Sequence, residues 1–151
     1  EEIVKEINSN DFDIFSKSSY LHYCVIEHIR LFNTVNVNMP RSVEKTMVYR
    51  GINFAKGDQL FILFSSILRD SNIFSEPDVF KPLRWNSFPE EFQDMVFGIG
   101  PQQCTSKNIS PLLYKVIIYN ILKNFNVKLE SPIVKNKELY FINPYDIIFS
   151  I

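Results

Sequence analysis

The sequence predicts a mainly helical α+β domain with a small antiparallel sheet. Apolar residues recur at helical spacing over residues 20–32 and again over residues 110–125. Strand-forming residues gather at 46–49 and 59–64, and short apolar runs follow the second helical segment. A chain of 151 residues is long enough for a hydrophobic core but leaves little room for a second domain.

The first helical segment, from about residue 20 to residue 32, has N-cap candidates in Ser18 and Ser19. Within it Glu27 and Arg30 are three residues apart and therefore share one face. A buried charge without a partner costs several kcal/mol, whereas an exposed i,i+3 pair contributes only a few tenths. The two side chains are therefore expected either to have buried partners or to form a weak surface pair.

Residues 46–49 and 59–64 are expected to pair as antiparallel strands, joined by a bent connection that contains Gly51 and Gly57. The stretch from 70 to 100 contains three prolines and several aromatic-centred turns, which favour a long irregular segment. Such a segment in a compact domain is usually functional or wraps around something.

The second helix is expected to begin near Ser110, with Ser110 as its cap and Pro111 in its first turn. A start directly after Cys104 would place Pro111 inside the helix, at a cost of about 3 kcal/mol. The tail then offers three apolar runs that predict terminal strands, including a hairpin: 127–129, 139–142 and 147–151.

Charge and composition exclude several classes of function. The 16 basic and 17 acidic side chains give a net charge of −1, so the chain lacks the positive field that attracts nucleic acid. No apolar run is long enough to span a bilayer, and no signal-peptide pattern opens the chain. Two cysteines, Cys24 and Cys104, do not make a disulfide framework and favour a reducing compartment. Because the chain begins with Glu1, we expect it to be an excerpt or a processed product.

The two histidines are poor candidates for a metal site. His22 and His28 are six residues apart on the first helical segment, so their side chains point in different directions and do not easily chelate one metal. Both are interpreted as ordinary helix residues, and Cys24 as a packing residue.

Cys104 is the strongest candidate for chemistry, because it ends a glycine-punctuated loop, Phe97-Gly98-Ile99-Gly100-Pro101-Gln102-Gln103-Cys104. Glycine tolerates positive φ and allows the backbone to approach a flat cofactor closely. A cysteine thiolate that ligates haem iron pushes electron density onto the metal. The alternative is a small buried hydrophobe, which is what most free cysteines are.

Three motifs together resemble cytochromes P450 in order and rough spacing. They are Glu27-His28-Ile29-Arg30, Phe80-Lys81-Pro82-Leu83-Arg84-Trp85 and the loop that ends at Cys104. The whole chain resembles the C-terminal, haem-thiolate portion of that family. The resemblance implies five segments: a helical segment 1–33, a small sheet 34–69, a meander and cysteine loop 70–104, a last helix 105–126 and terminal strands 127–151.

The resemblance also implies a role for each motif residue. Cys104 would be the axial ligand of haem b, and the loop residues Phe97, Gly98, Gly100 and Gln102 would contact the cofactor. Arg41 would reach a haem propionate, as a guanidinium suits a carboxylate. Glu27, Arg30 and Arg84 would be structural residues that brace the meander under the haem.

The function implied is that of a monooxygenase, which inserts one oxygen atom of dioxygen into an apolar organic substrate. Electrons would come from a redox partner, a reductase or a ferredoxin. The chain by itself is expected to be inactive, because the resemblance covers only the proximal side of a haem. The implied location is the cytoplasm or the cytoplasmic face of a membrane, with membrane association only through a segment preceding this chain.

Some positions depart from the family pattern and favour a second interpretation. Gln102 stands where the family usually has an arginine, Ser106 where it commonly has a glycine, and Leu113 where it commonly has a glutamate. These departures favour a non-enzymatic remnant or interaction module that has lost haem chemistry. A third interpretation is an unrelated α+β interaction domain; in any P450-like structure, by contrast, Glu27 and Arg84 would both lie beside Arg30.

Overall fold

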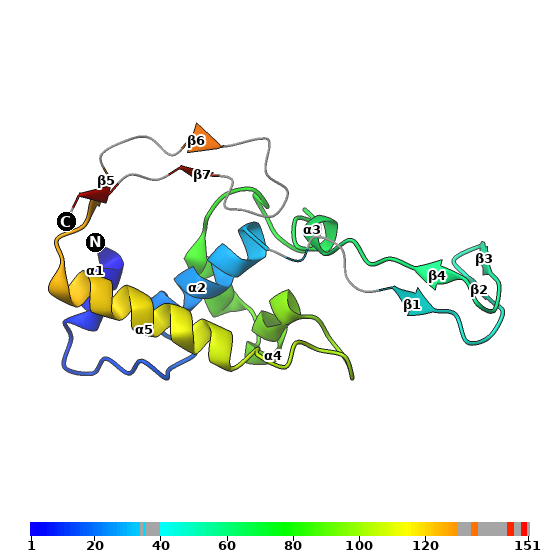
Figure 1. The fold of residues 1–151 in the computed structure, drawn as a ribbon, viewed down its shortest axis with the longest axis horizontal. Coiled ribbons are helices and arrows are strands. Elements are labelled where there is room, and N and C mark those ends of the chain that lie inside the picture. Colours follow the sequence, from blue (N-terminus) through cyan, green and yellow to red (C-terminus); the bar gives the residue numbers. More distant parts are fainter. Residues whose placement is uncertain (34, 36–39, 130–133, 136–144, 147–148, 151) are drawn as a thin grey trace. The chain divides into compact units, whose positions relative to one another are not determined.

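The computed structural model describes residues 1–33, 35, 40–129, 134–135, 145–146 and 149–150. These residues form two compact units (Figure 1). Residues 1–27 and 81–151 make up the first unit, and residues 28–80 make up the second.

The described part of the first unit is mainly helical. It contains α1 (Glu2–Ile7), most of α2 (Tyr20–Leu31), η1 (Pro82–Ser87), α4 (Glu90–Gln93), η2 (Asp94–Phe97) and α5 (Ile109–Asn124). The N-terminal two turns of α2 supply much of the core, because every residue from 21 to 27 is buried. Among the side chains packed in this unit are Ile7, Leu21, Val25, Ile26, Trp85 and Val96.

The N-terminus of α2 is capped by two side chains. Ser19 Oγ accepts a hydrogen bond from His22 N at 3.1 Å, which confirms Ser19 as an N-cap. Glu6 of α1 accepts two more, from Tyr20 N at 2.7 Å and from Leu21 N at 2.8 Å. Three of the four N–H groups that a helix start leaves without a partner are thereby satisfied, and the last turn of α1 is joined to α2.

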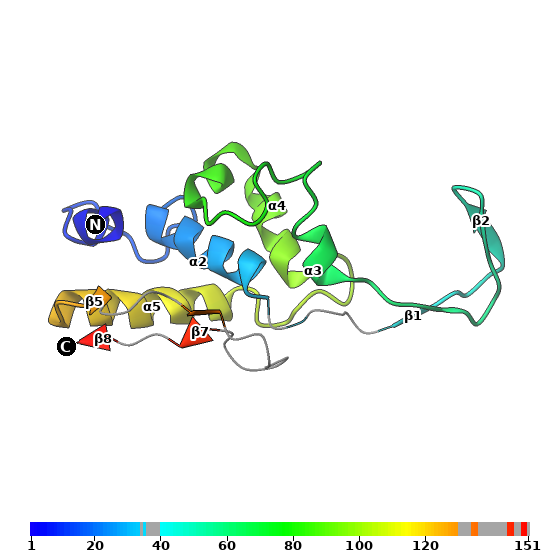
Figure 2. The ribbon, with the colours of Figure 1, turned by 90° about the horizontal axis from the view of Figure 1, so that it is seen from above.

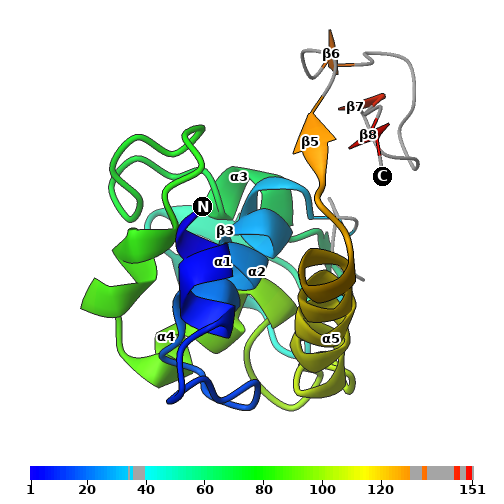
Figure 3. The same ribbon diagram turned by 90° about the vertical axis from the view of Figure 1, so that its left-hand side faces the viewer.

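Helix α5 begins at Ile109, as expected from the proline, but Ser110 is not its cap. The chain enters the helix through a turn at 105–108, in which Ser106 O accepts from Ile109 N at 3.0 Å and from Ser110 N at 2.8 Å. This backbone acceptor lets the helix start one residue early without a side-chain cap. Pro111 remains in the first turn, where its missing N–H costs nothing. Figure 3 shows the strand β5 (Lys128–Leu129) following the C-terminal end of this helix.

The stretch from 70 to 104 is less irregular than the sequence predicts, because its prolines start short helices. Pro82 is the first residue of η1, and Pro89 is the N-cap of α4. The φ angle of proline is already suited to a first helical turn, where the missing N–H is not needed. The segment between Lys81 and Gly98 is therefore a series of three short helices.

The described part of the second unit contains two small strand pairs and one short helix. The predicted pairing of 46–49 with 59–64 is wrong. β2 (Met47–Tyr49) pairs with β3 (Ile52–Phe54), and β4 (Gln59–Leu60) pairs with β1 (Arg41–Ser42). The reason is the turn between β2 and β3, where Arg50 and Gly51 have φ angles of 49° and 79°. Positive φ at both central residues makes a tight hairpin, so the partner of β2 must follow at once.

Within the second unit, the β2–β3 hairpin and α3 (Phe64–Ile67) lie at opposite ends of the β1–β4 pair, as Figure 2 shows.

The terminal strands form two further antiparallel pairs. β5 (Lys128–Leu129) pairs with β8 (Phe149–Ser150), and β6 (Val134–Lys135) pairs with β7 (Tyr145–Asp146). β5 and β8 fall within two of the predicted apolar runs, whereas β6 and β7 were not predicted. The run 139–142 lies outside the described residues. Within the described part of the chain, none of the helices combines the length and hydropathy needed to cross a membrane.

Candidate functional site

The most deeply buried charged group of the first unit is the carboxylate of Glu27, which is 0% exposed. Its Oε1 accepts hydrogen bonds from Lys81 N at 2.9 Å and from Arg84 Nε at 3.1 Å. Its Oε2 accepts from the indole Nε1 of Trp85 at 3.0 Å. All three donors come from the start of η1, so one carboxylate of α2 fixes the position of that segment.

The Glu27–Arg84 pair is an ion pair in the protein interior, since the Arg84 side chain is only 6% exposed. Removing two charges from water is costly, and the cost is offset only when good geometry and further hydrogen bonds satisfy both groups. The Lys81 and Trp85 donors meet this condition on the Glu27 side. Loss of either charge would leave the other buried without this opposite charge, so the pair is expected to be sensitive to substitution.

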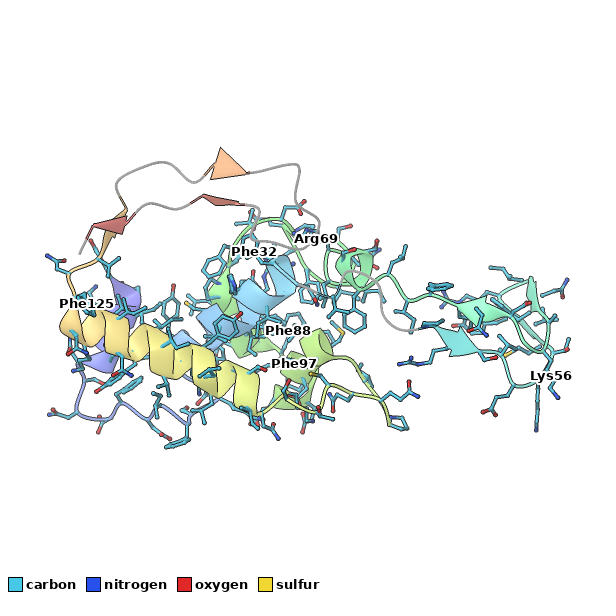
Figure 4. The ribbon with its side chains drawn as sticks, in the orientation of Figure 1. Phe32, Lys56, Arg69, Phe88, Phe97 and Phe125 are labelled. Atoms are coloured by element: carbon cyan, nitrogen blue, oxygen red, sulfur yellow. The ribbon has the colours of Figure 1, made fainter. Side chains whose placement is uncertain are left out.

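Trp85 also connects this carboxylate to the segment that leads to the cysteine loop. Its ring lies 5.7 Å from that of Phe88, and Phe88 stacks on Phe92 of α4 at 4.5 Å (Phe88 is labelled in Figure 4). Ring pairs at these separations contribute about 0.5–1.5 kcal/mol each beyond their burial. The three aromatic side chains therefore join η1 to α4, which is followed directly by η2 and the loop.

Arg30 belongs to the second unit and contacts several other residues of that unit. It is 0% exposed, and its Nη1 donates to Leu68 O and Pro77 O, both at 2.7 Å. Its guanidinium carbon lies 4.9 Å from the centre of the Phe74 ring. Five N–H donors in a planar fork allow one arginine to bind several carbonyls at once. Arg30 thereby joins the end of α2 to the chain around residues 68–79.

The cysteine loop is closed by backbone and side-chain hydrogen bonds. The backbone N of Cys104 donates to Phe97 O at 3.0 Å (Phe97 is labelled in Figure 4). The side-chain Nε2 of Gln103 donates to Gly98 O at 2.7 Å. Gly98 and Gly100 have φ angles of 86° and 91°, which only glycine adopts readily. The loop is therefore held in one conformation in which its first and last residues meet.

Cys104 itself is exposed, and its Sγ lies 3.2 Å from Ser106 Oγ. Just beyond it, Lys107 Nζ forms an ion pair with Asp94 Oδ2 at 2.9 Å, which ties the end of the loop back to η2. Cys24, by contrast, is buried, and burial raises the pKa of its thiol to about 11. A thiol with so high a pKa stays protonated at neutral pH and is a poor nucleophile.

The donor set at Cys104 fits a haem. Among the described residues, no group of three His, Cys, Asp or Glu side chains is placed to hold a metal ion. A solvent-facing sulfur on a loop with glycines, without further protein ligands, suits a metal whose remaining ligands come from a macrocycle. Of the other loop residues, Phe97 is half-buried, Gly98 is buried and Gln102 is exposed. Arg41 lies in β1 of the second unit and is half-buried.

Sequence reasoning missed two residues of this region. Trp85 has a detectable signal, because a buried indole N–H needs an acceptor and this is the only tryptophan in the chain. Gln103 has no such signal: an amide side chain in a loop is usually solvated, and its bond to Gly98 O depends on the folded loop. Glu27 and Arg84 were selected as structural residues, and the structure brings their side chains together.

The comparisons with known proteins agree with these observations. The cytochrome P450 family model matches residues 1–147, so the chain belongs to the cytochrome P450 family. Cytochrome P450 3A15 of Cavia porcellus is 30% identical over 119 residues, which cover 76% of this chain and 24% of that protein. The cholesterol 22-monohydroxylase CYP90B52 of Paris polyphylla is 25% identical over 124 residues, or 80% of this chain and 26% of that protein.

A zebra fish cytochrome P450 has a similar fold, with a TM-score of 0.72 at 16% identity over 99% of this chain and 37% of that one. The chain spans about a quarter of the length of the curated relatives it matches. The resemblance to cytochromes P450 and the mainly helical α+β class are confirmed, and an unrelated interaction domain is excluded.

His22, on the buried face of α2, is the other titratable group of note in this unit. Its Nε2 lies 3.1 Å from Gln93 Oε1, and its side chain is buried. Burial, together with the positive charge of Lys115 and, more weakly, of Lys17, lowers the pKa of His22 to about 4; Gln93 and Glu90 oppose the shift. The folded protein therefore keeps this imidazole uncharged at neutral pH.

Substitution of Glu27 by Gln should destabilise the protein by about 3–5 kcal/mol, because Arg84 is then buried without its counter-charge. Urea unfolding followed by circular dichroism measures the difference. The matched control is Glu90→Gln, which removes an exposed ion pair with Lys17 and should cost no more than about 1 kcal/mol. Equal losses in the two variants would contradict the assigned importance of Glu27.

The folded state should lose stability between pH 6.5 and pH 4 because of His22. The unfolded chain takes up a proton near pH 6.5, whereas the folded chain resists it down to about pH 4. The stabilisation is thus fully present above pH 6.5 and is lost as the pH falls, by about 3 kcal/mol in all. Urea midpoints at pH 7 and pH 4.5 measure the loss, and His22→Gln should reduce it; an unchanged pH dependence in that variant would contradict the assignment.

Proposed function

We propose that this chain is the haem-thiolate portion of a cytochrome P450-type monooxygenase, with Cys104 as the proximal ligand. The observation that carries the proposal is an exposed thiol at the end of a hydrogen-bonded, glycine-shaped loop in a member of this family. Because the chain spans about a quarter of its relatives' length, the oxygen-inserting activity would belong to a longer protein and not to these residues alone.

The residues of this chain would hold and orient the cofactor. Cys104 Sγ would bind the iron, and the closed loop would keep the sulfur in place. Phe97 and the two glycines would pack close to the flat ring, and Arg41 would supply a positive charge for a propionate. Gln102 would donate hydrogen bonds without adding charge. The haem, when bound, supplies the reductive activation of dioxygen, which thiolate ligation favours.

The substrate and partner classes follow from the relatives. The cholesterol 22-monohydroxylase among them is named for an apolar substrate, which supports an apolar organic substrate here. A reductase or a ferredoxin would deliver the electrons. Both described cysteines are free, which agrees with a reducing compartment such as the cytoplasm or the cytoplasmic face of a membrane.

A second candidate function is supported by the loop sequence. With Gln102 in place of an arginine and Ser106 in place of a glycine, the loop has lost a cation that would face a propionate. Weaker haem binding is the physical consequence. The second candidate is therefore a P450-like module that has kept the family fold without its haem chemistry, and haem affinity discriminates between the two.

Reconstitution of this chain with haem should give a red-shifted carbon monoxide Soret band, because a cysteine thiolate is an electron-rich ligand to the iron. The measurement is a reduced carbon monoxide difference spectrum. The band should disappear in Cys104→Ala and remain in Cys24→Ala, since Cys24 is buried and protonated. Haem uptake with the same spectrum in Cys104→Ala would overturn the ligand assignment, and no uptake by a longer parent chain would favour the second candidate.

Substitution of Ser106 by Ala should lower the iron reduction potential of the reconstituted protein. The Ser106 hydroxyl lies 3.2 Å from Cys104 Sγ, and a deprotonated sulfur forces the hydroxyl to be the donor. Loss of this hydrogen bond leaves more negative charge on the sulfur and stabilises the oxidised iron. Spectroelectrochemical titration measures the potential. Ser110→Ala, which alters a hydroxyl inside α5, is the matched control; an unchanged or higher potential in Ser106→Ala would contradict the prediction.

A further inference from the structure

The first unit contains a cavity of about 170 Å³ whose lining does not include Cys104. Its walls come from the loop before α2, from α2 itself, from η2 and from the start of α5. Both charged and apolar side chains line it. They are Phe15, Lys17, His22, Ile26, Asp94, Phe97, Lys107, Asn108, Pro111, Leu112 and Lys115.

Lys115 is the first unusual group in this cavity, because it is only 3% exposed. Its Nζ donates to Ser16 O at 3.1 Å. An ammonium has three N–H donors, and none of the carboxylates in the described part of the chain forms an ion pair with this one. Burial lowers the pKa of Lys115, and the nearby Asp13 only partly opposes the shift. A buried cation with unused donors is favoured by a counter-anion.

His22 is the second unusual group, because it is 4% exposed and one of its ring nitrogens is unused. Among the buried side-chain nitrogens and oxygens that the structure describes, its Nδ1 stands out as having no hydrogen-bond partner. Such groups are normally satisfied by protein, water or ligand. His22 lines the cavity, and because Gln93 can serve either as donor or as acceptor to Nε2, the tautomer with a proton on Nδ1 is available as a donor.

The remaining charges of the lining give a positive balance. Lys107 is paired with Asp94, which also lines the cavity, and Lys17 is paired with Glu90. Lys115 is therefore the lining lysine without a direct ion pair, with Asp13 and Glu6 acting on it from a greater distance. The first turn of α5 contributes Asn108, Pro111 and Leu112, and the positive end of a helix dipole adds to the attraction for an anion.

The other half of the lining is apolar and limits the size of a ligand. Phe15, Ile26, Phe97, Pro111 and Leu112 supply aromatic and aliphatic surface. An apolar cavity of about 150 Å³ is large enough for benzene. A cavity with this volume and this lining therefore suits a molecule with a small apolar body and one anionic end, and suits a fully hydrated ion poorly.

We propose that this cavity binds a small organic carboxylate, with the carboxylate on Lys115 Nζ and His22 Nδ1 and the apolar body against Phe15 and Ile26. The ligand would supply a carboxylate in direct contact with Lys115, which Asp13 and Glu6 attract only from beyond ion-pair distance, and the partner that His22 Nδ1 lacks. The proposal does not depend on haem, because neither group belongs to the cysteine loop.

Benzoate tests the proposal, with benzamide as its uncharged counterpart of the same shape. The 151-residue chain, labelled with ¹⁵N, is titrated with each compound while the imidazole resonances of its two histidines are followed by NMR. Benzoate should shift the His22 resonances in a saturable manner and leave those of His28 unchanged. Benzamide should bind at least about tenfold more weakly, because it cannot compensate the ammonium charge. No saturable shift of His22, or equal binding of the two compounds, would overturn the proposal.

Two substitutions in α5 provide the matched test. Lys115→Met keeps the length of the side chain and removes its charge, and should weaken benzoate binding at least about tenfold. Lys123→Met is the control. Lys123 is exposed and lies at the far end of α5, where its Nζ donates to Asn8 Oδ1. Equal benzoate affinity in Lys115→Met and the unmodified chain would overturn the proposal. If Lys115→Met does not fold, the comparison of benzoate with benzamide on the unmodified chain decides it.

Discussion

The carboxylate of Glu27 is the group on which the order of the first unit depends. It lies in the interior of the protein, where an ionised group is stable only when it is fully paired and hydrogen-bonded. Three donors from the start of η1 meet this requirement: the Lys81 backbone, the Arg84 guanidinium and the Trp85 indole. Because η1 supplies all three donors, Glu27 determines where the chain between residues 81 and 85 must lie.

This local constraint extends to the cysteine loop through the intervening short helices. The aromatic contacts from Trp85 through Phe88 lead to α4, and η2 follows without a break. At the end of η2 the loop folds back on itself, with Cys104 N on Phe97 O. An exposed sulfur is therefore connected, through half-buried aromatic contacts and a closed loop, to a buried ion pair. In the proposed function, this closed loop would hold the sulfur in place for a large, flat cofactor.

The sequence predicts those parts of the fold that depend on local patterns. Helical periodicity locates α2, and Pro111 locates the start of α5, because both signals lie within a few residues of the element. The hairpin at Arg50-Gly51 was missed because a positive φ at an arginine has no local signal, so the strand after it was given the wrong partner. The contact between Glu6 of α1 and the Tyr20 amide at the start of α2 joins residues fourteen apart in sequence. Periodicity carries no information on such a contact. The Glu27–Arg84 pair, 57 residues apart, was suggested by family resemblance and not by residue pattern.

The amide hydrogen of Lys81 offers the most direct test of the role assigned to Glu27. This amide donates to the buried Glu27 Oε1 from an exposed residue outside any long helix or sheet. If Glu27 holds the chain at this point, native-state hydrogen exchange at Lys81 should require an opening free energy within about 1 kcal/mol of that for global unfolding. Exchange at Lys81 at the rate of an unprotected amide, while the amides of α2 remain protected, would contradict the account.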